Sequence, residues 1–222
     1  LGSSTGGPVL SGGITLNKDL ILSKFGTTGG SQVTGGITGT GNLTISNNAT
    51  TGTITLATGA VNLVGSITNG GFATGLTTIS ADIGSGVTGI IQNSATSSLT
   101  LSGANIAFTG GITVNAGILQ LGGTGLDQLF YGMQLKLNGG LLDLNGRNGV
   151  VSTLVSDTPT IAGTVADHPA SVYTYTKSSG KSSTRYTRYT VGFPAIGVGL
   201  HLSRQAVVIP LKSLWQTPIS PF

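Results

Sequence analysis

Residues 99–121 read LTLSGANIAFTGGITVNAGILQL. Apolar side chains occupy every second position in Leu99-Thr-Leu, Ile112-Thr-Val and Leu119-Gln-Leu, and Thr or Gln stands between them. A period of two is that of a β-strand with one buried face. The apolar runs are too short, and too often followed by Gly or Asn, to form amphipathic helices. This stretch therefore predicts short strands joined by turns, with almost no helix.

The same alternation recurs along the first two thirds of the chain, and it repeats. The tetrapeptide Gly-Gly-Ile-Thr occurs at 12–15, 35–38 and 110–113, and the segment 43–63 aligns with 99–121 at an offset of 56 to 58 in sequence number. This offset indicates about two coils of a β-solenoid, in which each repeat buries its apolar face only by stacking on its neighbours. Further predicted strands are Ile14–Leu16, Asn42–Ile45, Thr53–Leu56, Val61–Leu63 and Ser98–Leu101.

The composition excludes several other classes of protein. The 222 residues include 38 Gly, no Cys and only 7% charged side chains, and all six acidic residues are Asp, whereas an average soluble domain has about 25% charged residues. Helical bundles, charged disordered tails, collagen and disulfide scaffolds do not have this composition. In a solenoid, identical positions stack about 4.8 Å apart, so like charges there would destabilise every rung. Low charge is an expected consequence of stacking.

Two segments resemble a known repeat. Leu99-Thr-Leu-Ser-Gly-Ala-Asn, followed by Phe108-Thr-Gly-Gly-Ile-Thr-Val-Asn-Ala-Gly-Ile-Leu-Gln-Leu-Gly, is similar to the autotransporter-associated β-strand repeat of bacterial surface and secreted proteins. Asn138-Gly-Gly-Leu-Leu-Asp-Leu-Asn-Gly resembles the next coil. Ile106 stands where the family has a small polar residue. The resemblance is most specific over 99–146, weaker over the rest of 1–176, and ends near 177. It implies a right-handed parallel β-helix that is exported and displayed outside the cell.

The charges divide the chain into two parts. Residues 1–167 hold four Lys or Arg and six Asp, whereas residues 168–222 hold the other six Lys or Arg and no acid. We therefore expect β-solenoid repeats over 1–176 and a basic, strand-rich segment over 177–222. Such a basic segment can bind acidic glycans or nucleic acid, or it can be a solvated edge whose like charges discourage stray strand pairing. We expect no nucleic-acid partner.

The C-terminal segment has its own strand pattern. Val172–Thr176, Tyr186–Val191, Ile196–Leu202 and Val207–Leu211 alternate around a Ser- and Gly-rich loop, which predicts antiparallel hairpins in place of coils. The segment can cap the last coil, or it can add a strand to a neighbouring subunit. Under the second hypothesis the candidate partner-binding residues are Tyr186, Arg188, Tyr189, Ile196, Val198, Leu200, Leu202, Val207, Ile209 and Leu211.

The sequence offers little chemistry for catalysis. The two His residues, His168 and His201, have no nucleophile arranged with them, and the six Asp are scattered. Asp127 and Asp143 are close enough in sequence to lie on adjacent coils as an acid/base pair, but Asp143 belongs to the repeat pattern. No calcium loop, zinc cluster or nucleotide-binding glycine motif is present. We expect no catalytic residue, metal or cofactor.

Three functions follow in order of preference. The first is an extracellular structural protein, a stalk, fibre or surface-layer component that self-associates end to end. The second is an adhesin, or a module that binds carbohydrate or ice. The third, which the scattered Asp residues disfavour, is an enzyme acting on polysaccharide. No apolar run is long enough to predict a membrane helix. The chain begins at Leu1 without a signal-peptide pattern, which suggests a processed or partial product.

Overall fold

The chain folds into an all-β solenoid, in which the strands expected at 14–16, 53–56, 99–101, 112–114 and 118–121 are all present. Among the described residues there is no helix. Val61–Leu63 forms an isolated bridge at Val61 in place of a strand. The computed structural model describes residues 7–104, 107–123, 127–129, 133–145, 148–151, 153–157, 163–167, 171–173, 189–191 and 200–202.

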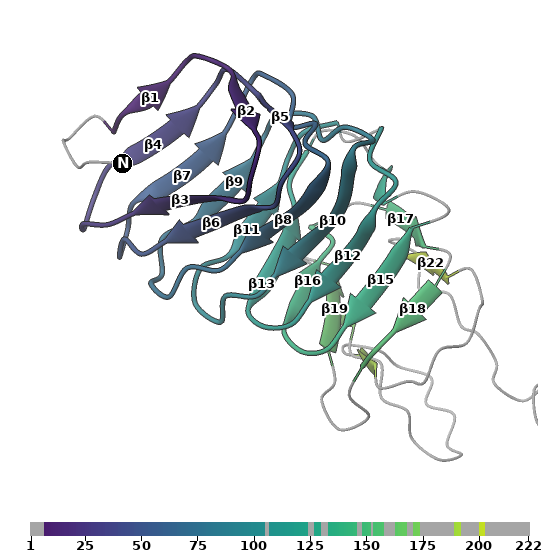
Figure 1. Cartoon of the computed structure of the whole chain (residues 1–222). Coiled ribbons are helices and arrows are strands. Elements are labelled where there is room, and N and C mark those ends of the chain that lie inside the picture. The colour runs from purple at the N-terminus through teal and green to yellow at the C-terminus, as the bar shows by residue number, and fades with distance from the viewer. Residues whose placement is uncertain are drawn as a thin grey trace, which may run out of the picture.

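Each coil passes in turn through three faces, which we call I, II and III. The strands of face III run in one direction in front while those of face I run in the opposite direction behind, and the chain advances from the N-terminal coil with a right-handed sense (Figure 1). Face I contains, in stacking order, β1 (Val9–Leu10), β4 (Gly30–Val33), β7 (Thr53–Leu56), β9 (Thr77–Ile79), β11 (Leu99–Leu101), β13 (Ile118–Leu121), β16 (Leu141–Asp143) and β19 (Gly163–Asp167).

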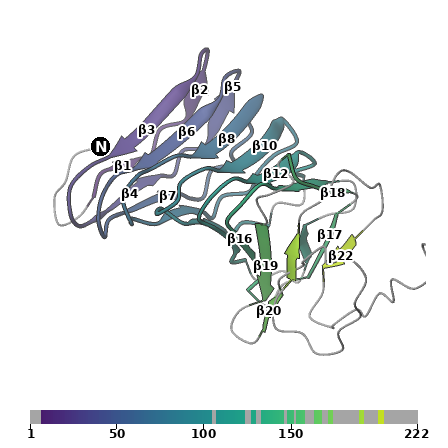
Figure 2. The same cartoon turned by 90° about the horizontal axis from the view of Figure 1, so that it is seen from below.

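Faces II and III complete the coil, and Figure 2 shows face III on the opposite side of the solenoid from face I. In the first coils face II is short and consists of β2 (Ile14–Leu16) and β5 (Ile37–Gly39), continued by single bridges at Val61 and Ile83. In the later coils β14 (Asp127–Leu129) and β17 (Asn148–Val151) follow a strand of face I and precede a strand of face III, so they take the place of face II in the chain. Face III contains β3 (Leu20–Lys24), β6 (Leu43–Asn47), β8 (Gly65–Asn69), β10 (Val87–Gln92), β12 (Gly111–Val114), β15 (Gln134–Leu137) and β18 (Thr153–Val155).

The parallel register fixes the length of a coil. On face III, Leu20 pairs with Leu43, Leu43 with Ile67, Ile67 with Ile90 and Ile90 with Ile112, so the sequence number advances by 22 to 24 from one coil to the next. On face I the advance falls to 20 from Leu99 to Leu119 and returns to 23 from Ile118 to Leu141. The corner that precedes β13 is therefore shorter than the corners before it.

The core consists of columns of aliphatic side chains that stack along the axis. Leu43, Ile67, Ile90 and Ile112 form such a column, and Leu56, Ile79, Leu101 and Leu121 form another. All of these side chains are buried. Because burying one Leu or Ile side chain stabilises a fold by about 1.5–3 kcal/mol, each coil gains stability only when its neighbours are in place.

The register corrects one inference from the repeats. The alignment of 43–63 with 99–121 matches Leu43 in β6 of face III with Leu99 in β11 of face I, and Ile54 in β7 with Ile112 in β12. The offset between the two segments is therefore about two and a half coils instead of two. Faces I and III carry the same alternating pattern, so an alignment that moves from one face to the other scores well. Only Gly-Gly-Ile-Thr at 12–15 and 35–38 marks a true one-coil repeat, with Ile14 paired to Ile37.

The C-terminal strands run against the coils. The sequence predicts antiparallel hairpins among the strands of this segment. Antiparallel strands are present among the described residues, but each pairs with a strand that precedes the segment: β20 (Ser171–Tyr173) and β21 (Tyr189–Val191) pair with β19, and β22 (Leu200–Leu202) pairs with β17 (Asn148–Val151). β17 itself pairs in parallel with β14 (Asp127–Leu129). Parallel stacking thus ends at β17 and β19, whose next neighbours come from later in the same chain.

Candidate functional site

Polar side chains gather where the chain turns from face III to face I. We call this turn the III–I corner, and in successive coils it comprises residues 25–29, 48–52, 70–76, 93–98, 115–117 and 138–140. The first four corners have five to seven residues, whereas the last two have three. The III–I corner is therefore wide in the first four coils and tight in the last two.

The inside of the longer corners holds a buried hydrogen-bond network. Asn69 Nδ2 donates to Gln92 Oε1 at 2.8 Å and to the Ser97 carbonyl at 2.8 Å, and Asn69 Oδ1 accepts the Thr77 hydroxyl at 3.0 Å. Gln92 Nε2 in turn donates to the Ser97 carbonyl at 2.9 Å. In the coil before, Asn47 Nδ2 donates to the carbonyls of Gly52 and Leu76. These side chains give the carbonyls at the wide turns hydrogen-bond donors, and the Leu76 carbonyl also accepts the backbone N–H of Ile54 at 3.0 Å.

A lysine is also buried at this corner. Lys24 is fully buried, and its Nζ donates to the carbonyl of Thr28 at 3.3 Å. The side chain fits because residue 52 is glycine: a Cβ atom there would lie 2.4 Å from Lys24 Cε. Lys24 pairs in register with Asn47, so a long and then a shorter polar side chain fill the same corner in adjacent coils.

In the last two coils the interior of the corner is apolar. The column that contains Asn69 and Gln92 continues as Val114 and Leu137, and both of these side chains are buried. The short turns need glycine in the left-handed region, with φ of +64° at Gly117 and +68° at Gly140. At the short turns the Gly117 carbonyl accepts the backbone N–H of Leu141 at 2.7 Å.

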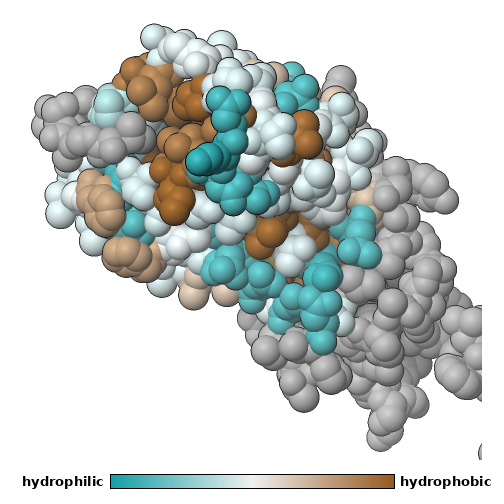
Figure 3. Space-filling view, viewed as in Figure 1, coloured by the Kyte–Doolittle hydropathy of each residue, from teal (hydrophilic) through white to brown (hydrophobic). Residues whose placement is uncertain are grey.

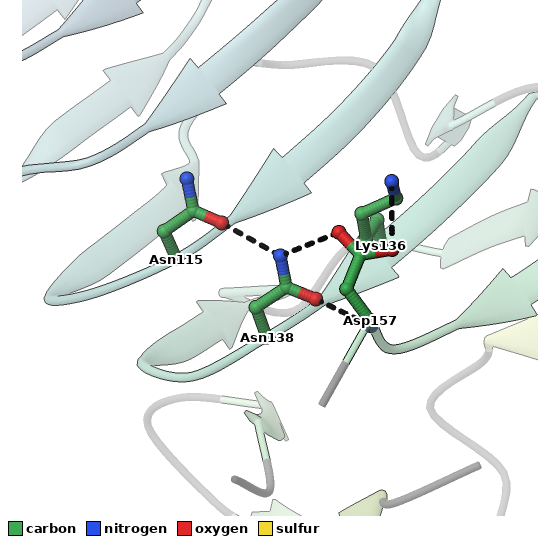
Figure 4. A network of polar contacts seen from close by, with 4 residues as sticks. All are labelled: Asn115, Lys136, Asn138 and Asp157. Carbon is green, nitrogen blue, oxygen red and sulfur yellow. Dashed lines mark hydrogen bonds and ion pairs between the residues drawn. The ribbon is translucent and has the colours of Figure 1, made fainter. Parts of the chain in front are cut away.

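On the outside of the same corner, asparagines form a ladder (Figure 4). Asn115 Nδ2 donates to Asn93 Oδ1 at 3.1 Å, and Asn138 Nδ2 donates to Asn115 Oδ1 at 2.8 Å. Asp157 ends the ladder: its Oδ2 accepts from Asn138 Nδ2 at 3.1 Å, and its Oδ1 lies 3.0 Å from Lys136 Nζ. The hydrogen bond from Lys136, supported by that from Asn138, lowers the pKa of the Asp157 carboxyl. Each amide satisfies the next, so the ladder ties coils together.

Aspartates elsewhere are also used in coil-to-coil contacts. Asp19 Oδ1 accepts the backbone N–H of Asn42 at 2.8 Å, and this bond, with the Asn42 side-chain amide, lowers the pKa of Asp19. Asp143 Oδ2 accepts Gln120 Nε2 at 2.8 Å. Asp127 lies in β14 opposite Asn148, and Asp143 lies in β16 opposite Gln120, so the two aspartates are not register neighbours. The geometry does not support the acid/base pair considered from their spacing.

The described residues contain no group of three or more His, Cys, Asp or Glu that could hold a metal ion. His201 lies in β22 opposite Val150, and His168 falls outside the described residues. Within the described part of the chain, no helix is long and apolar enough to cross a membrane.

The candidate partner-binding residues fall in two groups. Tyr189 lies in β21 on the edge of β19, and Leu200 and Leu202 lie in β22 opposite Val151 and Gly149. The remaining candidates fall outside the described residues: Tyr186, Arg188, Ile196, Val198, Val207, Ile209 and Leu211.

The sequence analysis missed two features of the III–I corner, the asparagine ladder and a pair of exposed phenylalanines. The ladder had a signal, because Asn93, Asn115 and Asn138 follow one another at the spacing of one coil. Phe25 and Phe72 are separated by close to two coils. Neither spacing could be recognised until the length of the coil was known.

In comparisons with known proteins, no protein-family model, no curated protein and no solved structure matches the chain. The chain is thus placed by its architecture alone, as a parallel β-solenoid whose last coils are flanked by antiparallel strands.

Proposed function

We propose that the protein is an extracellular structural β-solenoid, a stalk, fibre or surface-layer component that associates end to end. The autotransporter-like repeats at 99–146 support location outside the cell. The observation that carries the proposal is the edge of the first coil. Among the described residues, β1, β2 and β3 each have a strand partner on one side only.

The edge strands also expose apolar side chains: Val9 in β1 is 57% exposed and Ile21 in β3 is 65% exposed. An edge of unpaired backbone N–H and C=O groups beside exposed apolar side chains is a template for further strand pairing. In the first coil, proline and exposed charge stand next to these strands and not within them: Pro8 precedes β1, and Lys18 and Asp19 precede β3. In Figure 3 the largest hydrophobic area on the visible face lies toward the N-terminal coils. A further coil contributed by a second copy would continue all three faces.

Charge placed at the edge tests the proposal. The variant Val9→Lys/Ile21→Lys should abolish or shorten the filaments that electron micrographs of the full chain are expected to show, because Lys side chains on an edge strand oppose further strand pairing. The control is Ile118→Lys, at a position 38% exposed in β13, which lies in the middle of face I. The proposal is wrong if the full chain stays monomeric at every concentration, or if both variants assemble like the parent.

Removal of residues 177–222 tests the role of the C-terminal segment. This truncation takes away β21 and β22 and so uncovers edges of β19 and β17. If the segment is a cap, the truncated chain should form longer assemblies, because both ends of the solenoid can then stack. If the segment instead joins a neighbouring subunit, assembly should be lost.

A further inference from the structure

Two phenylalanines stand exposed on the III–I corner of the N-terminal coils. Phe25 is 60% exposed and Phe72 is 73% exposed. The third aromatic side chain described in the coils, Phe108, is buried in the core at 2% exposure. Both rings are therefore open to a ligand on the same corner of the solenoid.

The two rings are equivalent in the solenoid and two coils apart. Lys24 pairs with Asn47 and Ile45 with Asn69, and extending both registers aligns Phe25, Asn48 and Phe72 in one column. Asn48 holds this column together, because its backbone N–H donates to the Lys24 carbonyl and its Oδ1 accepts the Phe72 N–H at 3.0 Å. The rings are therefore separated by two strand spacings, roughly 9–10 Å along the axis.

The surroundings of the rings are neutral and rich in hydroxyl groups. The three corner segments 25–29, 48–52 and 70–76 contain no charged residue. Thr27, Thr50 and Thr74 stack beside the rings: the Thr50 hydroxyl donates to the Thr27 carbonyl at 3.4 Å, and the Thr74 hydroxyl donates to the Thr50 carbonyl. With their hydrogens committed in this way, the hydroxyls of Thr50 and Thr74 present lone pairs that accept hydrogen bonds from a ligand.

This combination fits a sugar chain better than a protein partner. A stable protein interface buries about 1,200–2,000 Å² with a continuous apolar centre, whereas here a polar Asn48 separates two single rings. The C–H face of a pyranose ring stacks on a phenyl ring while its hydroxyl groups donate to nearby oxygens. In an extended β-1,4-linked glycan, alternate sugars present the same face, and their separation is close to two strand spacings.

We propose that the III–I corner of the N-terminal coils binds a neutral β-1,4-linked glycan that runs along the solenoid axis. One pyranose ring stacks on Phe25, the next-but-one ring of the glycan stacks on Phe72, and the intervening sugar lies over Asn48. Phe25 directly follows the edge strand β3, and Phe72 lies two coils further along the axis, so a single copy of the chain carries both rings.

Titration of the full chain with cellohexaose and chitohexaose, followed by calorimetry, tests the proposal. At least one of the two hexasaccharides should bind, and its disaccharide should bind more weakly because it cannot reach both rings. The variants Phe25→Ala and Phe72→Ala should each weaken binding about tenfold, which corresponds to about 1.4 kcal/mol for the lost stacking contact, and Phe25→Tyr should retain binding because it keeps the ring. Val64→Ala, which removes an apolar side chain that is 55% exposed and lies outside the corner, should bind like the parent.

Because both rings are exposed, the alanine variants should keep the thermal unfolding midpoint of the parent, which separates loss of binding from loss of fold. The proposal is overturned if neither hexasaccharide binds, if the disaccharide binds as tightly as the hexasaccharide, or if the two phenylalanine variants bind like the parent.

Discussion

Individual side chains in this solenoid hold one coil to the next through donors and acceptors that the strand ladder does not use. At the corners, a carboxylate or amide oxygen accepts the backbone N–H of the following coil: Asp19 takes that of Asn42, Asn62 that of Gly86, and Asp82 that of Ala104. These bonds join residues 22 to 24 apart in sequence, and a short polar side chain at a corner is enough to reach the next coil.

The buried network around Asn69 gives a first prediction. Asn69→Ala removes the donor to Gln92 Oε1, the acceptor of the Thr77 hydroxyl and one of the two donors to the Ser97 carbonyl. The free energy of unfolding should therefore fall by about 2–4 kcal/mol, as measured by urea denaturation. The double variant Asn69→Leu/Gln92→Val should lose less free energy of unfolding than the two single variants together. The reason is that Val114 and Leu137 already occupy the same column as apolar side chains. Ser31→Ala serves as a control, since the buried Ser31 hydroxyl has no hydrogen-bond partner and its loss should leave stability unchanged or slightly higher.

Asp19 gives a prediction about pH. Hydrogen bonds from Asn42 lower the pKa of Asp19 below its ordinary value of 3.8, so the folded state favours the ionised form. The stabilisation is fully present above pH 3.8 and is lost as pH falls through the lower, folded-state pKa. The midpoint of thermal unfolding should therefore drop across this acidic window, and Asp19→Asn should drop less. An equal drop in both proteins would show that Asp19 does not contribute.

Among the elements, strands could be predicted from sequence and corners could not. Thr53–Leu56 and Ile118–Leu121 are visible as strands because period-two alternation is a local property. The length of a corner depends on the side chains packed inside it: Asn47 and Lys24 lie inside wide corners, whereas the tight corners enclose apolar side chains. The length of a coil could be read from the sequence only to within half a coil, because β6 and β11 have nearly the same sequence on different faces. The asparagine ladder needs contacts between side chains one coil apart, and no local pattern reveals them.

The tight corners make a prediction at this scale. Gly140 has φ of +68°, and a Cβ there would lie 2.5 Å from the carbonyl oxygen of Gly117 in the coil before. Gly140→Ala should lower the free energy of unfolding by about 1–3 kcal/mol, because it combines an unfavourable backbone conformation with a clash against backbone. The matched change is Gly12→Ala, where a Cβ would have no atom within 4 Å. That variant should be neutral or gain up to about 1 kcal/mol, and equal losses for both variants would refute the argument.

For the molecule as a whole, stability should depend on position along the axis. Each coil contacts only its neighbours, so a defect in one coil spreads to adjacent coils and weakens with distance. Ile90→Ala in β10 should lower the free energy of unfolding by about 2–5 kcal/mol, because the cavity lies in the middle of a continuous column.

Leu22→Ala in β3, at the edge, should raise hydrogen exchange in β3 and β6 while leaving β12 and β15 as protected as in the parent. Exchange that rises equally in all coils would show a single cooperative unit.

The direction of the coil-to-coil hydrogen bonds determines how the solenoid yields to tension. These bonds run along the axis, so a pull on the two ends of the solenoid loads the bonds of one terminal coil at a time and not all rungs together. A detached coil frees the segment that separates register partners such as Leu20 and Leu43, which corresponds to roughly 75 Å of extended chain. Single-molecule stretching should therefore show a series of low-force steps of that length. A stalk built in this way would absorb a sudden load by unpeeling at one end, and it would regain its length when the freed coil stacks again on the intact rung beneath it.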